Sequence, residues 1–227
     1  MQHTKEFSKR AKDYQDYNYL QVKIAKKLIS QISNKPKRIL DLGCGSGEVF
    51  KEIDWEYEKF IAVDFAKNMC KLHPKNPKIE VLNFDFDDKN LYKKLLDSNI
   101  DTVISSSSLQ WSQNLELLAQ NISKISDNIY LSIFTNNTFK TINKTTNLNS
   151  ILPTSENLLK IFDDFEFEIE NYKLYFKNNN LIFKYIKNSG VSGGVKRLDF
   201  KSTKKLIKEY PVDYLEFEVM FLKKINN

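Results

Sequence analysis

The sequence has little cysteine, histidine, glycine or arginine, and it has no long apolar run. Its two cysteines, Cys44 and Cys70, lie far apart without a second pair, so we expect no disulfide framework, no zinc site and no other metal. No stretch approaches the roughly 18–20 uninterrupted apolar residues of a membrane helix, and the N-terminal segment lacks the apolar core of a signal peptide. The sequence therefore predicts a cytoplasmic, thiol-reduced protein without a membrane partner.

Apolar side chains are plentiful, and lysine dominates the charge. Hydrophobic residues make up 41% of the 227 residues and aromatic residues 13%, which is enough for a sizeable core and excludes wholesale disorder. The formal charge is +6, but lysine is abundant throughout the chain, which indicates a general compositional bias. Nucleic acid is therefore disfavoured as a partner, whereas an acidic protein remains open. With no apolar seam evident, we expect a monomer.

The first two thirds of the chain alternate between strand and helix patterns. Apolar residues recur every four positions over residues 17–33, which predicts an amphipathic helix. Five short apolar runs, separated by helical patterns, predict strands at residues 38–42, 60–64, 79–84, 102–104 and 129–134. Such alternation is typical of a mostly parallel, Rossmann-like α/β sheet with helices on both faces.

The last third changes character. Two further strands are predicted, at residues 165–176 and 215–222, and the segment between them, residues 177–210, contains helical patterns and a second group of glycines. We expect a seven-stranded sheet whose last strand is antiparallel, with a helical lid inserted between strands six and seven. Residues 1–34 are expected to form capping helices, and residues 1–227 a single domain.

The sharpest motif lies at residues 41–47, where a buried strand carrying Asp41 passes into Gly43, Gly45 and Gly47 and then into a helix. In open α/β sheets, ligands bind beyond the carboxyl ends of such strands. A dinucleotide fingerprint has the spacing G-x-G-x-x-G, whereas this loop reads G-x-G-x-G behind an acidic residue. A carboxylate there repels a phosphate, so the loop favours a cationic ligand.

Acidic residues also follow the second and third predicted strands. Asp64 is placed to accept hydrogen bonds from ribose hydroxyls. Together with the loop, it resembles the class I S-adenosylmethionine-dependent methyltransferases. That resemblance implies that the loop contacts the amino-acid end of S-adenosyl-L-methionine, that Asp85 meets the adenine amine and that Phe86 packs on its ring. Phe65 and Ser105 join this cofactor-binding set. The alternative is that Asp64 and Asp85 only cap helices.

The segment after strand four bears on the methyl acceptor. It reads Ser105-Ser-Ser-Ser-Leu-Gln110-Trp111 and lacks the prolines found in methyltransferases of nucleobase amines, which disfavours that class. No histidine or cysteine lies in a credible catalytic place, so the acceptor should need no general base. A carboxylate, which is already ionised at neutral pH, is such a nucleophile. Positioning it in line with the sulfonium methyl would supply most of the rate.

Three longer stretches resemble the malonyl-acyl-carrier-protein O-methyltransferases of biotin synthesis. They run over residues 7–14, 105–111 and 181–194, and the C-terminal stretch around Tyr210 to Val219 matches as well. This resemblance implies esterification of the free carboxylate of a malonyl thioester held on acyl carrier protein.

The resemblance also suggests roles for single residues. Arg10 and Tyr14 lie on one face of an N-terminal helix that folds over the cofactor, where Arg10 pairs with the cofactor carboxylate. Gln110 and Trp111 floor the acceptor pocket, and Arg197 clamps the malonyl carboxylate or the carrier's phosphate. For each, an ordinary alternative stays open: a surface arginine, a packed tryptophan beside a helix-starting glutamine, or a neighbouring lysine or tyrosine as the clamp.

The predicted lid is rich in lysine, which suits an acidic acyl carrier protein. Its basic residues are Lys184, Lys187, Lys196, Arg197, Lys201, Lys204, Lys205 and Lys208. Solvated lysines in a lysine-rich chain are the simpler explanation. Two other functions stay open: a methyltransferase of small carboxylic acids or quinone-type acceptors, and an RNA-associated methyltransferase.

Overall fold

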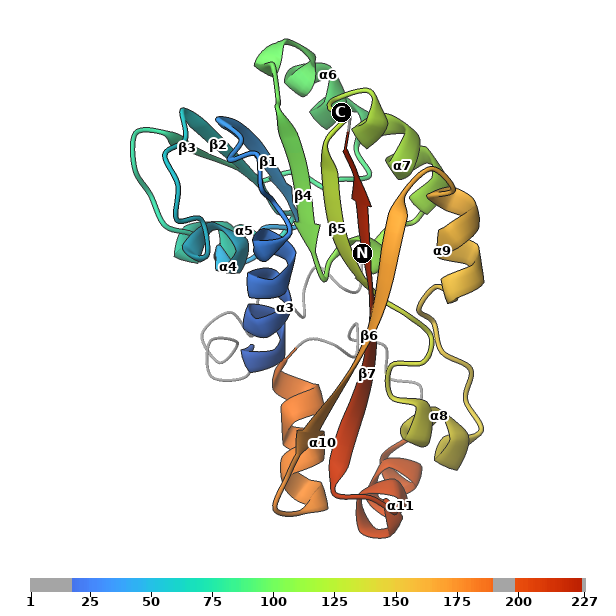
Figure 1. Ribbon diagram of the computed structural model, residues 1–227. Coiled ribbons are helices and arrows are strands. Elements are labelled where there is room, and N and C mark those ends of the chain that lie inside the picture. The colour runs from blue at the N-terminus through green and yellow to red at the C-terminus, as the bar shows by residue number, and fades with distance from the viewer. Residues whose placement is uncertain (1–17, 190–198, 226–227) are drawn as a thin grey trace.

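The computed structural model describes residues 18–189 and 199–225, and its centre is a seven-stranded sheet (Figure 1). The strand order is β3-β2-β1-β4-β5-β7-β6. Strands β1 to β5 pair in parallel, whereas β7 runs antiparallel to both β5 and β6. The strands are β1 (Arg38–Leu42), β2 (Lys59–Val63), β3 (Ile79–Leu82), β4 (Thr102–Ser106), β5 (Ile129–Phe134), β6 (Glu166–Tyr175) and β7 (Tyr214–Lys224). The predicted fold class is confirmed, including the antiparallel last strand.

The central strands are apolar on both faces because helices cover both. Along β1, Ile39 belongs to one apolar cluster and Leu40 to the other, so successive side chains enter opposite layers. The first layer contains α3 (Tyr19–Ser30), and the second contains α7 (Leu115–Ser123). This double burial explains why the short strands read as continuous apolar runs rather than as alternating ones.

The remaining helices are short, and many begin at a side-chain cap. They are α4 (Glu48–Lys51), α5 (Lys67–Leu72), α6 (Lys89–Leu95), α8 (Lys140–Thr146), α9 (Ser155–Ile161), α10 (Asn179–Asn188) and α11 (Phe200–Glu209), with two 3₁₀ turns at Leu96–Ser98 and Leu109–Trp111. The side chains that accept a hydrogen bond from a first-turn N–H are Asp88, Asn114, Thr154, Asn178 and Asp199. These residues fix where the corresponding helices start.

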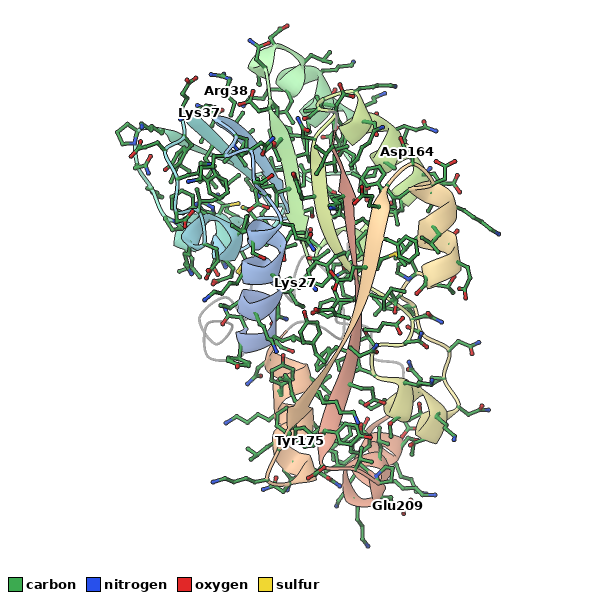
Figure 2. The ribbon with its side chains drawn as sticks, viewed as in Figure 1. Lys27, Lys37, Arg38, Asp164, Tyr175 and Glu209 are labelled. Atoms are coloured by element: carbon green, nitrogen blue, oxygen red, sulfur yellow. The ribbon has the colours of Figure 1, made fainter. Side chains whose placement is uncertain are left out.

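Helix α3 is held rigidly against the sheet. Its side chains Leu20, Ile24 and Leu28 are fully buried. In the last turn of the helix, Lys27 forms an ion pair with Glu168 of β6 at 2.8 Å and a second one with Glu170 (Figure 2). Helix α3 is therefore anchored to the sheet by its buried face and, in its last turn, by Lys27.

Two helices, α10 and α11, are inserted between β6 and β7, as the sequence predicts. They lie at the lower end of the view in Figure 1, beside the ends of β6 and β7 that are linked through them. Asn179 joins the two helices, because its amide nitrogen donates to the carbonyl oxygens of Ile207 at 3.0 Å and Tyr210 at 3.1 Å. Across the described ranges, no helix is both long and apolar enough to cross a membrane.

Candidate functional site

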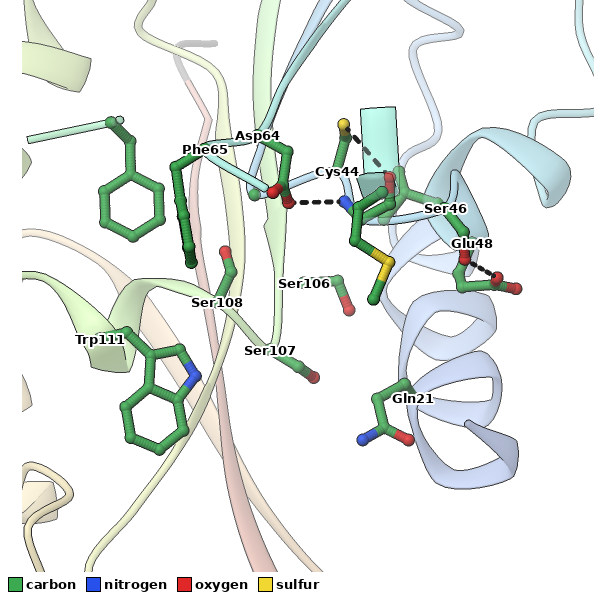
Figure 3. Close-up of a pocket in the computed structure, with 15 residues that line it drawn as sticks. Gln21, Cys44, Ser46, Glu48, Asp64, Phe65, Ser106, Ser107, Ser108 and Trp111 are labelled. Atoms are coloured by element: carbon green, nitrogen blue, oxygen red, sulfur yellow. Dashed lines mark hydrogen bonds between the residues drawn. The ribbon is translucent and has the colours of Figure 1, made fainter. Parts of the chain in front are cut away.

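A pocket opens where the sheet changes direction. Strand β1 lies between β2 and β4, so the connections that leave β1 and β4 diverge on opposite faces, and a crevice forms beyond their carboxyl ends. The pocket is lined by the loop after β1, by Asp64 and Phe65 after β2, by Phe86 after β3, and by residues 106–108 with Trp111 after β4 (Figure 3). Gln21 of α3 completes the wall.

The loop after β1 has the backbone conformation that requires glycine. Gly43, Gly45 and Gly47 have φ values of +75°, +53° and +89°, which lie in the left-handed region. The backbone N–H groups of Gly43 and Cys44 both donate to the carbonyl oxygen of Val63, at 2.8 and 3.0 Å. These bonds tie the loop to β2 and leave its outer surface facing the pocket.

Asp64 connects β2 to the same loop. Its carboxylate accepts hydrogen bonds from the backbone N–H of Gly45 at 3.0 Å and from that of Ala66 at 2.7 Å (Figure 3). The side chain is 7% exposed, and burial raises its pKa to about 6 although the two N–H bonds oppose that rise. Ala66 directly precedes α5, so Asp64 orders both the start of a helix and the wall of the pocket.

Asp85 and Phe86 separate after β3. Phe86 is buried and lines the pocket. Asp85 is exposed, and its carboxylate accepts from the backbone N–H of Asp87 at 3.0 Å. The cap of α6 is Asp88, so the structure does not bear out the alternative that Asp85 caps a helix. The contact of Asp85 with adenine stays a prediction.

Asp41 lies beneath the loop rather than in the pocket wall. It is fully buried, and neither carboxylate oxygen has a hydrogen-bond partner among the described residues. Burial, reinforced by the negative charge of Asp64, raises the pKa of Asp41 well above its ordinary value. The side chain of Asp41 therefore does not reach the pocket, because it is buried within β1.

The segment after β4 places different residues in the pocket than the sequence suggested. Ser105 is fully buried and donates to the carbonyl oxygen of Leu42 at 2.6 Å. Gln110 donates to the carbonyl oxygen of Ser107 at 2.7 Å and does not line the pocket, whereas Trp111 does. The serines at 106–108 line the wall, whereas Ser105 and Gln110 are not lining residues. The direct roles expected for Ser105 and Gln110 stay predictions.

Three predicted site residues lie outside the described residues. They are Arg10, Tyr14 and Arg197. Their contacts with the cofactor or the acceptor stay predictions.

The sequence reasoning missed Gln21 and the serines at 106–108. A signal for Gln21 existed, because it lies on the same helix face as Ile24 and Leu28 and is therefore a polar residue on an apolar stripe. Ser107 has a φ of +57°, which a non-glycine residue rarely adopts and no sequence pattern indicates.

The pocket carries negative charge. Glu48 and Asp64 are its acidic lining residues, and none of the described lining residues is basic. Glu48 accepts from the hydroxyl of Ser46 at 2.9 Å and pairs with Lys51 at 2.8 Å, whereas the N–H partners of Asp64 carry no formal charge. A cation therefore fits this pocket better than a pyrophosphate does.

Comparison with known proteins identifies the class. Residues 40–127, which contain the loop, Asp64 and the segment after β4, match a family model described as "Methyltransferase domain". A SAM-dependent methyltransferase from Anabaena variabilis superimposes with a TM-score of 0.61 at 11% identity, over 99% of this chain and 94% of that one. Residues 40–127 thus resemble a methyltransferase domain, and its cofactor is S-adenosylmethionine.

Curated relatives share one name. The chain is 29% identical over 150 residues to malonyl-[acyl-carrier protein] O-methyltransferase of Bacillus cytotoxicus, a match that covers 62% of this chain and 52% of the relative. It is 26% identical to the protein of the same name from Acinetobacter baylyi, over 80% of this chain and 73% of the relative. The chain thus matches about half the length of the Bacillus relative. The resemblance found in the sequence is confirmed.

Proposed function

We propose that this methyltransferase esterifies the free carboxylate of a malonyl thioester carried by acyl carrier protein. The observation that carries the proposal is that the described lining residues offer no uncommitted base. The carboxylates of Asp64 and Glu48 already have partners, the first in two backbone N–H groups and the second in Ser46 and Lys51. His73 is buried against Phe50 and Phe60 and is not a lining residue. Cys44 does line the pocket, but burial raises the pKa of its thiol well above its ordinary value, so the thiol stays protonated. An acceptor that is already ionised needs no base.

The reaction then needs only alignment and the exclusion of water. A carboxylate oxygen of the acceptor attacks the methyl carbon, and the electron pair of the carbon–sulfur bond moves to sulfur. The products are a methyl ester and a neutral thioether, and no proton is transferred. Two opposite charges are neutralised in this step, so a pocket that replaces water by fixed dipoles favours it.

The chain's own residues would hold the donor. Asp64 is assigned to the ribose hydroxyls, and Phe86 is assigned to the adenine ring. The serines at 106–108 would then line the space beside the sulfur. These assignments rest on the positions of the residues in one pocket and on the class of the domain.

The basic surface for the carrier is proposed on α10 and α11. Lys184 and Lys187 of α10 are exposed, as are Lys201, Lys204, Lys205 and Lys208 of α11. Phe200, at the start of α11, is 86% exposed and offers an apolar contact within this lysine-rich surface. An acyl carrier protein is acidic, so such a surface would speed its association and make it sensitive to salt.

The test is methyl transfer from labelled S-adenosylmethionine to four acceptors: malonyl-acyl carrier protein, malonyl-CoA, a small carboxylic acid and RNA. Transfer to the malonyl carrier with the label recovered as a base-labile ester supports the proposal. Transfer only to RNA, or only to the small acid, overturns it.

Charge removal on α11 separates carrier docking from chemistry. Lys204 and Lys208 are four residues apart and share a helix face, so Lys204→Ala/Lys208→Ala should raise the KM for malonyl-acyl carrier protein about fivefold at low salt and leave that for malonyl-CoA unchanged. The matched control is Lys89→Ala/Lys93→Ala on α6, which removes the same charge far from the insert. An equal rise in the KM for malonyl-acyl carrier protein in both double variants would show that the net charge of the protein, and not a surface on α11, governs carrier binding.

Cofactor affinity should fall in mild acid. The pKa of Asp64 is raised to about 6, and ribose hydroxyls donate to the ionised carboxylate, so affinity for S-adenosylhomocysteine should decline as the pH drops through about 6. The stability of the free protein has the opposite sign, because a raised pKa gives a contribution that is present below about 4 and is lost as pH rises through about 6. Calorimetric titrations between about pH 5 and 8 measure the first effect, and Asp64→Asn should remove its pH dependence.

A further inference from the structure

Two polar side-chain atoms in the pocket have no hydrogen-bond partner among the described residues. They are the amide oxygen of Gln21 and the hydroxyl oxygen of Ser107, and both are buried. The side chain of Gln21 is more than nine-tenths buried, with 7% exposure. Figure 3 shows both side chains pointing into the pocket, across from Phe65. Buried polar groups are nearly always hydrogen-bonded, so two buried polar atoms without a partner in one pocket indicate that a polar group of a ligand binds there.

The surrounding structure holds both residues at the pocket. Gln21 lies on α3 between the fully buried Leu20 and Ile24, and Lys27 in the last turn of the same helix forms the ion pair with β6. Ser107 is held by its backbone, because its N–H donates to the carbonyl oxygen of Ser132 at 2.8 Å. The two groups therefore come from separate rigid elements and face a common space.

Their chemistry fits a zwitterion. A glutamine amide offers an acceptor and two donor hydrogens, and a serine hydroxyl offers one donor and an acceptor. Together they can satisfy a carboxylate and an ammonium without adding net charge. The charged lining residues, Asp64 and Glu48, can accept from an ammonium but cannot donate to a carboxylate.

The position of the pair selects one end of the methyl donor. Phe65 and Asp64 lie on the proposed nucleoside side of the pocket, and Gln21 lies on the other side of the space (Figure 3). S-adenosylmethionine has an α-amino-acid group at the end opposite its nucleoside. We propose that Gln21 and Ser107 bind this α-amino-acid group, an inference that rests on the part of the proposed function that assigns Asp64 to the ribose.

The test compares two ligands that differ only at that end. S-adenosylhomocysteine carries the amino-acid group, whereas 5′-methylthioadenosine has the same nucleoside and sulfur without it. For Gln21→Ala, calorimetry should show affinity for S-adenosylhomocysteine falling about ten- to a hundredfold and affinity for 5′-methylthioadenosine changing less than about threefold. Equal losses for both ligands, or no loss for either, would overturn the assignment.

Control variants separate ligand contact from folding. Gln31, at the end of the same helix, also has a buried amide oxygen without a partner among the described residues, but it lies outside the pocket. Gln31→Ala should leave both affinities unchanged. Ser107→Ala should reproduce the ligand split of Gln21→Ala with a smaller loss, and a Ser107→Ala variant that weakens both ligands alike would remove Ser107 from the proposal. These titrations contain no acceptor, so their outcome is independent of whether a malonyl thioester is methylated.

Discussion

Asp64→Ala is expected to weaken S-adenosylhomocysteine binding by a hundredfold or more. The substitution removes the acceptor for the N–H groups of Gly45 and Ala66, so the loop after β1 keeps its bonds to Val63 but loses the one at Gly45, which lines the pocket. It also removes the proposed acceptor for the ribose hydroxyls. Hydrogen bonds to a charged group contribute about 1.5–3 kcal/mol each, and about 2.7 kcal/mol corresponds to a hundredfold. Isothermal titration calorimetry measures the loss directly.

A matched carboxylate distinguishes this role from a general effect of charge. Asp85 is also acidic and lies near the pocket, but it is exposed and accepts only a local N–H from Asp87 among the contacts described. Asp85→Ala should therefore weaken binding by less than about tenfold. Asp64→Asn keeps the side-chain shape and removes the charge, but it can accept only one of the two N–H bonds, because its amide nitrogen is a donor. Comparable losses for Asp64→Ala and Asp85→Ala would contradict the special position of Asp64.

The succession of strands along the chain and the glycine loop were readable from the sequence because each depends on local patterns. A strand buried on both faces must be apolar throughout, as β5 is, and a left-handed turn such as that at Gly47 favours glycine. The predicted strands at residues 38–42 and 129–134 coincide with β1 and β5. The inserted segment was found because its helical patterns interrupt two strand patterns.

Features that depend on tertiary contacts were not readable. Helix α8 is polar and rich in threonine, which has modest helix propensity, and no pattern in the sequence predicts it. The structure shows what holds its start: the backbone N–H of Thr141 donates to the carboxylate of Glu216 on β7. That pairing joins residues 75 positions apart, so no local pattern can reveal it.

The same reasoning explains why the pocket wall after β4 was misplaced by one to three residues. Strand β4 continues to Ser106, beyond the predicted end at residue 104, and Ser107 then adopts its left-handed conformation. A run of four identical serines carries no signal of which hydroxyl is turned inward. The register against β1 and β5 decides it, and Ser105 is thereby directed to the backbone of Leu42.

Among the glycine-to-alanine substitutions in the loop after β1, Gly43→Ala should be the most disruptive. A Cβ at this position would lie 2.2 Å from the hydroxyl oxygen of Ser108 and 2.3 Å from its Cβ, and φ is +75°. Ser108 has little room to move, because its hydroxyl donates to the carbonyl oxygen of Leu42 at 2.9 Å and lies 2.7 Å from the hydroxyl oxygen of Ser105. We expect a loss of about 3 kcal/mol in the free energy of unfolding, or a fall of about 6–12 °C in Tm, together with loss of cofactor binding.

Gly45→Ala provides the control for backbone strain alone. Gly45 has a φ of +53°, but a Cβ there would meet no atom within 4 Å. This variant should lose only about 1–2 kcal/mol, the cost of a left-handed alanine. Removing the obstacle in a Gly43→Ala/Ser108→Gly double variant should recover part of the lost Tm, since the clash is relieved and the strain in φ remains. Equal melting temperatures for Gly43→Ala and Gly45→Ala would contradict this prediction. They would show that the close approach of Ser108 is not the reason why position 43 needs glycine.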